Sequence, residues 1–354
     1  MVDKNATIET VALYDNLDKL SNSHILFGHQ AATEYGRGWY GDKDRSDVKD
    51  ATGSHPAVVG HDFQNFTYAV QEETSIKEEQ LRLAGLISEQ YNRGGVITIA
   101  WHFPNPVAGD SFYWDDESVP AVSEIIPGGA YHERYKEILG RVGDFAHLVK
   151  GAKGEAVPMI FRPYHEFDGS WFWWGAEHAS PADFIQLWQF TVSYLRDSLH
   201  VHNFIYAFSP DCKYNTEEEY LEKYPGDEWV DLVGVDNYHD FGRDADGSLD
   251  AGGKKLQIVS DYAEKHKKLA AFTETGLESI PDTTWWTNTL LKTLKESNIK
   301  MTYVLVWRND SQSETHYYAS PAGHPSHADF VEFYNDPYTL FSNDLSDIYI
   351  LKIE

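Results

Sequence analysis

The chain has few cysteines and few basic residues. Cys212 is the only cysteine among 354 residues, which excludes an internal disulfide and a metal cluster held by several thiolates. Lysine and arginine together number 29, against 56 aspartate and glutamate residues, so the formal net charge is −27. The resulting field repels phosphate backbones and anionic headgroups. We therefore expect no nucleic-acid or membrane-surface partner, whereas a neutral substrate is compatible with this charge.

Long apolar runs are also missing. No part of the sequence is apolar over the length that a membrane span requires, so we expect no membrane span. Residues 1–20 lack the basic segment and the following apolar segment of a signal peptide. On these grounds both a cytoplasmic location and export with a leader outside this sequence stay open.

Short apolar runs alternate with segments of helical spacing. Eight runs rich in Ile, Val and Phe have the character of buried strands, and they begin at His24, Ala57, Val96, Val157, Asn203, Leu232, Leu269 and Met301. The clearest helical segments between them are residues 75–91, 133–150, 181–199, 253–267 and 284–296. Eight such alternations are typical of a parallel (β/α)8 barrel. The sequence thus predicts an α/β protein, a (β/α)8 TIM barrel.

No low-complexity linker or shift in composition divides the chain. We therefore expect residues 1–354 to form a single domain, with a leading helix at 5–20 and a closing helix at 327–345. Some loops are too long for ordinary turns, and loops of that length usually carry function. They are residues 34–53, 104–129 and 239–252. We expect such loops to form an active-site cleft at the carboxyl ends of the strands.

Polar side chains gather where the apolar runs stop. In (β/α)8 barrels the active site lies at the carboxyl ends of the strands, so residues at these positions are candidate site residues. They are His29, Gln30, His61, Asp62, Trp101, His102, Arg162, His165, Glu166, Asp211, Asp236, Tyr238, Glu274, Trp307 and Arg308.

The segment RPYHEFDGSWFWWG, residues 162–175, combines charged and aromatic side chains. A buried core favours the rings without the charges and an exposed surface favours the charges without the rings, so the combination indicates a cleft. We expect one of the four aromatic residues at 171–174 to pack under the helix that begins at Pro181. We do not expect all four rings to face inward. The rings that face the cleft can stack on the flat faces of sugars.

Glu166 and Glu274 directly follow strand residues instead of lying on helix faces. Cleavage of a glycosidic bond needs a carboxylic acid that protonates the leaving oxygen and a carboxylate that attacks or activates water. Strands four and seven can direct both side chains to one centre, as a retaining enzyme requires. His165 and Trp171 would raise the pKa of Glu166 by limiting its solvation, and Tyr238 or Arg162 would keep Glu274 ionised.

Other chemistries are less well supported. Either glutamate alone fits a solvated loop carboxylate or a structural ion pair, and only the pair favours catalysis. Histidines at strand ends are also found in metal hydrolases, but GHQ lacks a His-x-His pair and YHEFDG is not followed by a second helical histidine. Ser209 has no nucleophile elbow around it. We expect no metal, no cofactor and no serine triad.

The strand-end motifs resemble those of glycoside hydrolase family 26, the β-mannanases of a large retaining (β/α)8 clan. They run from Phe27 to Asp310 and comprise FGHQ, WHFPNP, FRPYHEFDGSWFWWG, SPD, GVDNY, FTETG and VWRND. The long motif with a later ETG is highly specific, whereas SPD alone is weak.

The resemblance implies that Glu166 is the acid/base and Glu274 the nucleophile. It further implies that His165 bonds the substrate near the reacting sugar or orients the nucleophile, and that Tyr238 is hydrogen-bonded to the nucleophile. The other residues it implies are His102 and Trp171 on either side of the cut, Trp307 under the reacting sugar, Arg308 on the next sugar on the non-reducing side, and Arg162 and Asp211 as braces. We also expect Phe172 and Trp114 to bind substrate.

The implied activity is that of a retaining β-mannanase that hydrolyses β-1,4-mannosidic bonds in mannan, galactomannan, glucomannan or manno-oligosaccharides by double displacement. Cleavage within the polysaccharide and release of mannobiose both stay open. The loops at 34–53, 104–129 and 310–327 would decide between them, because a cleft closed at one end would release short units. A related β-glycanase, such as a lichenase or β-1,3-xylanase, and a non-catalytic carbohydrate-binding barrel are the alternatives. Because polymers do not cross membranes, we expect a secreted, periplasmic or cell-surface location. A cytoplasmic location would fit imported oligosaccharides. We also expect a monomer.

Overall fold

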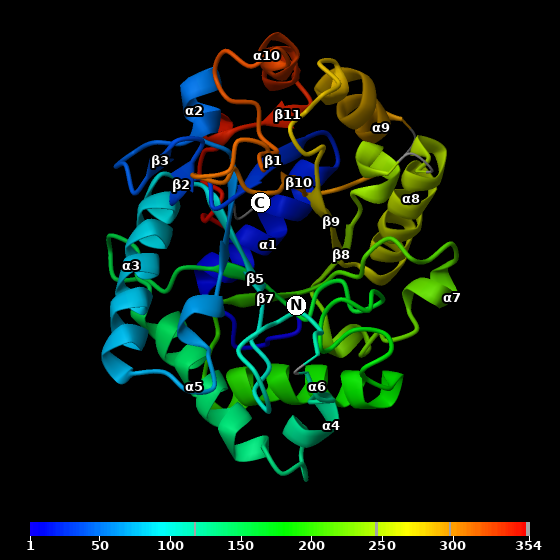
Figure 1. Ribbon diagram of the computed structural model, residues 1–354. Helices are drawn as coiled ribbons and strands as arrows, with labels where there is room; N and C mark the ends of the chain where they lie inside the picture. Colours follow the sequence, from blue (N-terminus) through cyan, green and yellow to red (C-terminus); the bar gives the residue numbers. More distant parts are fainter. Residues whose placement is uncertain (117, 245–246, 297–298, 352–354) are drawn as a thin grey trace.

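The computed structural model describes residues 1–116, 118–244, 247–296 and 299–351. Its centre is a closed barrel of eight parallel strands, in which β10 pairs with β1 (Figure 1). The strands are β1 Ile25–Gln30, β4 Val58–Asp62, β5 Val96–Trp101, β6 Met159–Pro163, β7 Phe204–Phe208, β8 Leu232–Asp236, β9 Leu269–Thr275 and β10 Tyr303–Val306. Each lies within one of the predicted apolar runs, so the predicted (β/α)8 barrel is confirmed.

Helices surround the barrel in the predicted order (Figure 1). The longer ones are α1 Ile8–Ser21, α3 Glu73–Asn92, α5 His132–Leu148, α6 Pro181–Ser193, α8 Leu249–His266 and α10 His327–Asn335, and the short ones are α2 Asp47–Thr52, α4 Val122–Ile125, α7 Glu217–Tyr220 and α9 Lys292–Lys295. Wider π-helical turns continue α6 at Tyr194–Ser198 and precede α9 at Trp285–Leu291. Within the described residues, no helix combines the length and the apolar character needed to cross a membrane.

Local sequence explains where α6 begins and where α10 ends. The Ser180 hydroxyl accepts a hydrogen bond from the Asp183 amide at 3.1 Å, and Pro181 occupies the first turn, where a missing N–H costs nothing. The prediction of a closing helix at 327–345 was wrong in length. The helix ends at Asn335 because Pro337 disfavours helical geometry at the residue before it.

Two small sheet elements were not predicted. Strand β11, Thr339–Leu340, follows α10 and pairs in parallel with the start of β1. The loop after β1 contains an antiparallel hairpin of β2, Tyr35–Gly36, and β3, Trp39–Tyr40. The predicted loop at 239–252 is shorter than expected, because α8 already begins at Leu249.

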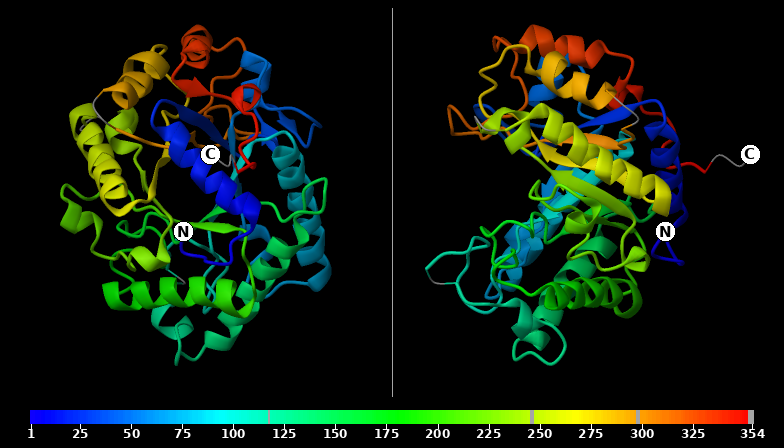
Figure 2. Two further views of the ribbon diagram at one scale, coloured as in Figure 1. Left: turned by 180° about the vertical axis from the view of Figure 1, so that it is seen from behind. Right: turned by 90° about the vertical axis from the view of Figure 1, so that its right-hand side faces the viewer.

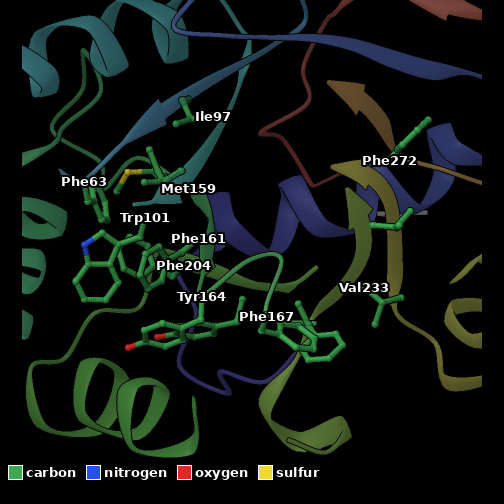
Figure 3. Close-up of a cluster of buried hydrophobic side chains, with 14 of the residues drawn as sticks. Phe63, Ile97, Trp101, Met159, Phe161, Tyr164, Phe167, Phe204, Val233 and Phe272 are labelled. Carbon is green, nitrogen blue, oxygen red and sulfur yellow. The ribbon is translucent and has the colours of Figure 1, made fainter. Parts of the chain in front are cut away.

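Apolar side chains fill two layers. The inner layer lies inside the barrel, and α1 closes it at the amino ends of the strands through Leu13 and Leu17 (Figure 2). The outer layer lies between strands and helices, where the rings of Phe161 and Phe204 have centroids 5.1 Å apart (Figure 3). Since one end of the barrel is closed, a site can form only at the carboxyl ends of the strands.

Candidate active site

Glu166 and Glu274 meet at the carboxyl end of the barrel. Glu166 lies three residues beyond the end of β6, Glu274 lies in β9, and Asp236 is the last residue of β8. One carboxylate oxygen from each of the three lies within 4.8 Å of the others. The predicted convergence of the two glutamates is therefore present, and it is the close pairing that a retaining glycosidase uses.

Glu274 is buried among hydrogen-bond donors. It is 3% exposed, and the Tyr238 hydroxyl donates to its Oε2 at 2.9 Å. The Arg162 guanidinium donates to its Oε1 and, at 2.7 Å, to Asp236 Oδ2. Both partners of Glu274 were predicted.

Arg162 supplies the counter-charge of this cluster. Burial opposes its charge, but Asp236 and Glu274 raise its pKa above the usual value. Three close carboxylates have the composition of a cation site, yet two of them already share this guanidinium. The arrangement is that of a charge-balanced buried network.

Glu166 has different neighbours. The residue is half-buried, and its Oε2 accepts a hydrogen bond from Trp171 Nε1 at 2.6 Å. Its backbone is held at a φ of 54°, with its amide donating to the Ser209 carbonyl at 2.9 Å. Poor solvation first, and then the charge of Glu274, raise the pKa of Glu166 well above its usual value. Glu166 is therefore suited to carry a proton.

Two histidines lie beside the glutamates. His165 is buried, and burial together with Arg162 and His102 lowers its pKa well below the usual value, so its ring is neutral. The His102 ring lies edge-on to it with centroids 4.6 Å apart. His102 Nδ1 is 2.5 Å from Asp62 Oδ2, which fixes the orientation of the imidazole.

The aromatic run at 171–174 faces inward more than predicted. Trp171 is partly exposed, whereas Phe172 is 3% exposed and both Trp173 and Trp174 are fully buried. The buried indoles donate to the Phe103 and His165 carbonyls, which removes the cost of burying their N–H groups. Three rings are thus buried where one was expected to pack under the helix, and the expectation that the four do not all face inward holds for Trp171.

Phe172 supports the site from behind. Its ring stacks on Trp174 with centroids 4.5 Å apart and lies 5.2 Å from the His165 ring. Trp171 instead reaches the glutamate over Gly169, where a Cβ would come within 2.3 Å of the indole. Close approach of the ring therefore requires glycine at this position.

A cavity of about 340 Å³ opens beside the glutamates, on the β10, β1, β4 and β5 side. Residues from the three loops expected to close one end of the cleft line it, at 34–35, 112–113 and 316, whereas the loop at 239–252 supplies no described lining residue. Among its other lining residues are Gln30, Asp62, His102, Trp307 and Arg308. The rings of His102 and Trp307 are 5.7 Å apart between centroids. We name this space the catalytic cavity.

Of the predicted site residues, His102, Trp307 and Arg308 line the catalytic cavity. Neither glutamate is among its described lining residues, and Trp114 and Asp211 have partners elsewhere. Trp114 stacks flat on His178 with centroids 3.7 Å apart. Asp211 lies beside the glutamates, and its amide donates to Asp168 at 2.6 Å. Burial, followed by the charge of Asp168, raises the pKa of Asp211 to about 7.

The structure adds partners whose roles were not predicted. Asp62 orients His102, and Asp236 shares the guanidinium of Arg162. Both were visible as polar residues at strand ends, but nothing in the sequence indicates which side chains they bond. Glu34 and Arg82 also line the catalytic cavity, and they come from a loop and a helix face that carry no comparable signal.

Comparison with known families gives the evolutionary relationship. The family described as glycosyl hydrolase family 26 matches residues 2–343 of this chain. The chain belongs to glycosyl hydrolase family 26. The resemblance drawn from its motifs is thereby confirmed.

Solved family 26 structures superpose closely on this chain. A β-mannanase from Bacteroides ovatus is 41% identical with a TM-score of 0.90, over 98% of this chain and 99% of that one. The protein GH26C from a Muricauda species is 36% identical with a TM-score of 0.93, over 100% of this chain and 96% of that one.

A curated family 26 relative is much longer than this chain. The mannan endo-1,4-β-mannosidase of Bifidobacterium adolescentis is 33% identical over 349 residues, which cover 94% of this chain and 34% of that protein. The chain therefore spans about a third of the length of that relative.

Proposed function

We propose that this chain hydrolyses β-1,4-mannosidic bonds in mannan, galactomannan or glucomannan with retention of configuration. Two relatives named for action on mannan, from Bifidobacterium adolescentis and Bacteroides ovatus, support the choice of substrate. The observation that carries the mechanism is the pair of close carboxylates, Glu166 and Glu274, with different neighbours.

In the first step, Glu274 attacks the anomeric carbon while Glu166 gives its proton to the leaving glycosidic oxygen. The carbon–oxygen bond breaks, and a glycosyl ester forms on Glu274. Arg162 and Tyr238 hold Glu274 in position for this attack. The sugar that becomes attached would lie between Trp307 and His102, which border the catalytic cavity.

In the second step, Glu166 acts as a base. It removes a proton from water, the oxygen attacks the anomeric carbon, and Glu274 leaves as a carboxylate. His165 cannot replace Glu166 as the acid, because its pKa is held well below the usual value. We propose that residues 1–354 form one catalytic domain that acts as a monomer. We also propose that it acts on polysaccharide outside the cell.

The test is a time course with linear mannan, galactomannan, lichenan and β-1,3-xylan, followed by NMR of the first-formed products. We expect mannan-derived substrates to be cleaved and the new reducing end to appear first as the β-anomer. Preferential cleavage of lichenan or β-1,3-xylan would overturn the substrate assignment. An α-anomer at early times would overturn the retaining mechanism. Binding without turnover of any of these polymers would indicate a carbohydrate-binding barrel.

A further inference from the structure

A second cavity of about 300 Å³ borders the catalytic cavity. It lies between the loop that carries the β2–β3 hairpin and the outer face of α3, which are neighbours in Figure 1. Its lining residues are Thr33, Glu34, Tyr40, Gly41, Asp42, Lys43, Asp44, Arg82, Gly85, Leu86, Glu89 and Arg93. Glu34 and Arg82 line both cavities, so the two spaces are neighbours separated by this ion pair. We name the second space the distal cavity.

The border between the cavities is a fixed polar edge. Glu34 Oε1 is 2.7 Å from His61 Nδ1, and Arg82 lies 2.9 Å from Glu34 Oε2. Arg82 also donates to Glu79 at 2.7 Å. Burial pushes the pKa of Glu34 upward, but His61 and Arg82 bring it below the usual value. A glycan can lie across this edge, because its hydroxyl groups can form hydrogen bonds with the polar side chains there.

Two tyrosines connect the cavities through the hairpin. Tyr35 and Tyr40 are directly paired across β2 and β3, and their rings lie 6.0 Å apart at an angle of 5°. Tyr35 lines the catalytic cavity and lies under the guanidinium of Arg308, whereas Tyr40 lines the distal cavity. Tyr40 is 69% exposed. A ring this exposed adds little to the core, but it offers a flat apolar face to a ligand.

We propose that the distal cavity binds a further hexopyranose unit of the glycan that is cleaved, with Tyr40 as its stacking surface. This inference rests on the proposed function, because the glycan must already occupy the catalytic cavity. Asp42, Glu89 and Arg93 line the same space and supply donors and acceptors for sugar hydroxyls. The unit is either the next sugar of the backbone or a galactosyl branch, since both present a flat apolar ring face.

Tyr40→Ala tests the proposal on linear manno-oligosaccharides of three to six units and on galactosyl-substituted ones. We expect kcat/KM to fall about two- to tenfold on substrates that reach the distal cavity, as loss of one aromatic contact predicts. The loss should depend on substrate length or branching. Leu81→Ala is the matched control, because Leu81 is 62% exposed on α3 but does not line the cavity.

The outcomes separate the sources of the sugar. A loss on long linear substrates indicates a backbone unit, and a loss confined to branched substrates indicates a galactosyl unit. No loss on either series, or an equal loss in Leu81→Ala, would overturn the distal site. Calorimetric binding of the same sugars to a Glu274→Ala background, with and without Tyr40→Ala, makes the same comparison without turnover. If the unaltered protein cleaves no mannan, the proposed function fails. The calorimetric comparison with and without Tyr40→Ala would still show whether the distal cavity binds a sugar.

Discussion

The surroundings of Glu166 and of Glu274 differ although the two carboxylates are neighbours. Around Glu274 are a guanidinium and a phenol, both within hydrogen-bonding distance. Around Glu166 the direct side-chain partner is the indole of Trp171, and the nearby charges are negative. Positive charge is therefore supplied to one glutamate and withheld from the other. This difference supports the proposed roles, in which Glu166 carries the proton and Glu274 is the attacking group.

Alanine replacement of either glutamate should have the largest effect on the rate of hydrolysis. Glu274→Ala should lower kcat by about 10⁵-fold or more, because no covalent intermediate can form. Glu166→Ala should lower it by about 10² to 10⁴-fold on mannan, and by less in the first step with an aryl glycoside whose leaving group needs no proton. Both are measured by initial rates on polymer and aryl substrates.

Azide distinguishes the two roles further. In Glu166→Ala it should intercept the glycosyl-enzyme and give a β-glycosyl azide, since the attack follows the first inversion. In Glu274→Ala it can replace the missing carboxylate and give the α-product. The opposite pattern of products would show that Glu166 is the nucleophile and Glu274 the acid/base.

The next prediction concerns the counter-charge around Glu274. Arg162→Gln leaves two buried carboxylates without their guanidinium, so the free energy of unfolding should fall by about 3 to 5 kcal/mol. Arg308→Gln is the control, because its pair with Asp310 is partly exposed, at 32% and 25%, and should contribute about 0 to 1 kcal/mol. Thermal or urea unfolding measures both. Equal losses in the two variants would refute the role of Arg162 as a buried counter-charge, and Arg162→Lys should recover part of the stability.

The smallest effect is expected at the indole beside Glu166. The hydrogen bond from Trp171 stabilises the ionised carboxylate, so Trp171→Phe should raise the pKa of Glu166 further. Activity that needs protonated Glu166 would then persist to higher pH. We expect the alkaline limb of the kcat/KM profile to move upward by about one unit, which corresponds to one hydrogen bond to a charged group.

Trp114→Phe is the control for this shift. Its ring stacks on His178, and its amide, which Trp114→Phe keeps, donates to the Trp171 carbonyl at 2.7 Å, so the pH profile should not move. A downward shift in Trp171→Phe would show that the indole does not stabilise the charged carboxylate.

The barrel was predictable because its signals are local. Each strand is a short apolar run, and Ser180 with Pro181 marks the beginning of α6. Errors occurred where two local signals compete. The pattern after His327 continues past Asn335, but Pro337 ends the helix there. The hairpin at 35–40 is too short to give a periodic pattern.

The two glutamates, Arg162 and Tyr238 were predictable because they end strands, and strand ends converge in this fold. The pairing of Arg162 with Asp236, 74 positions away, was not predicted, because nothing in the sequence indicates which side chain Asp236 bonds. The burial of Trp173 and Trp174 was also missed. Their N–H groups find carbonyl partners only in the folded chain, so sequence alone overstates how much of the aromatic run faces the cleft.

The backbone at Glu166 has a consequence for the evolution of this enzyme. A φ of 54° costs a residue with a side chain about 1 to 2 kcal/mol, and Tyr164, two positions earlier, is held at 51°. Glycine or asparagine would relieve this strain at position 166 but would abolish proton transfer. Selection for heat resistance alone would thus favour inactive descendants at this position, and a screen for thermostable variants needs activity as a second criterion.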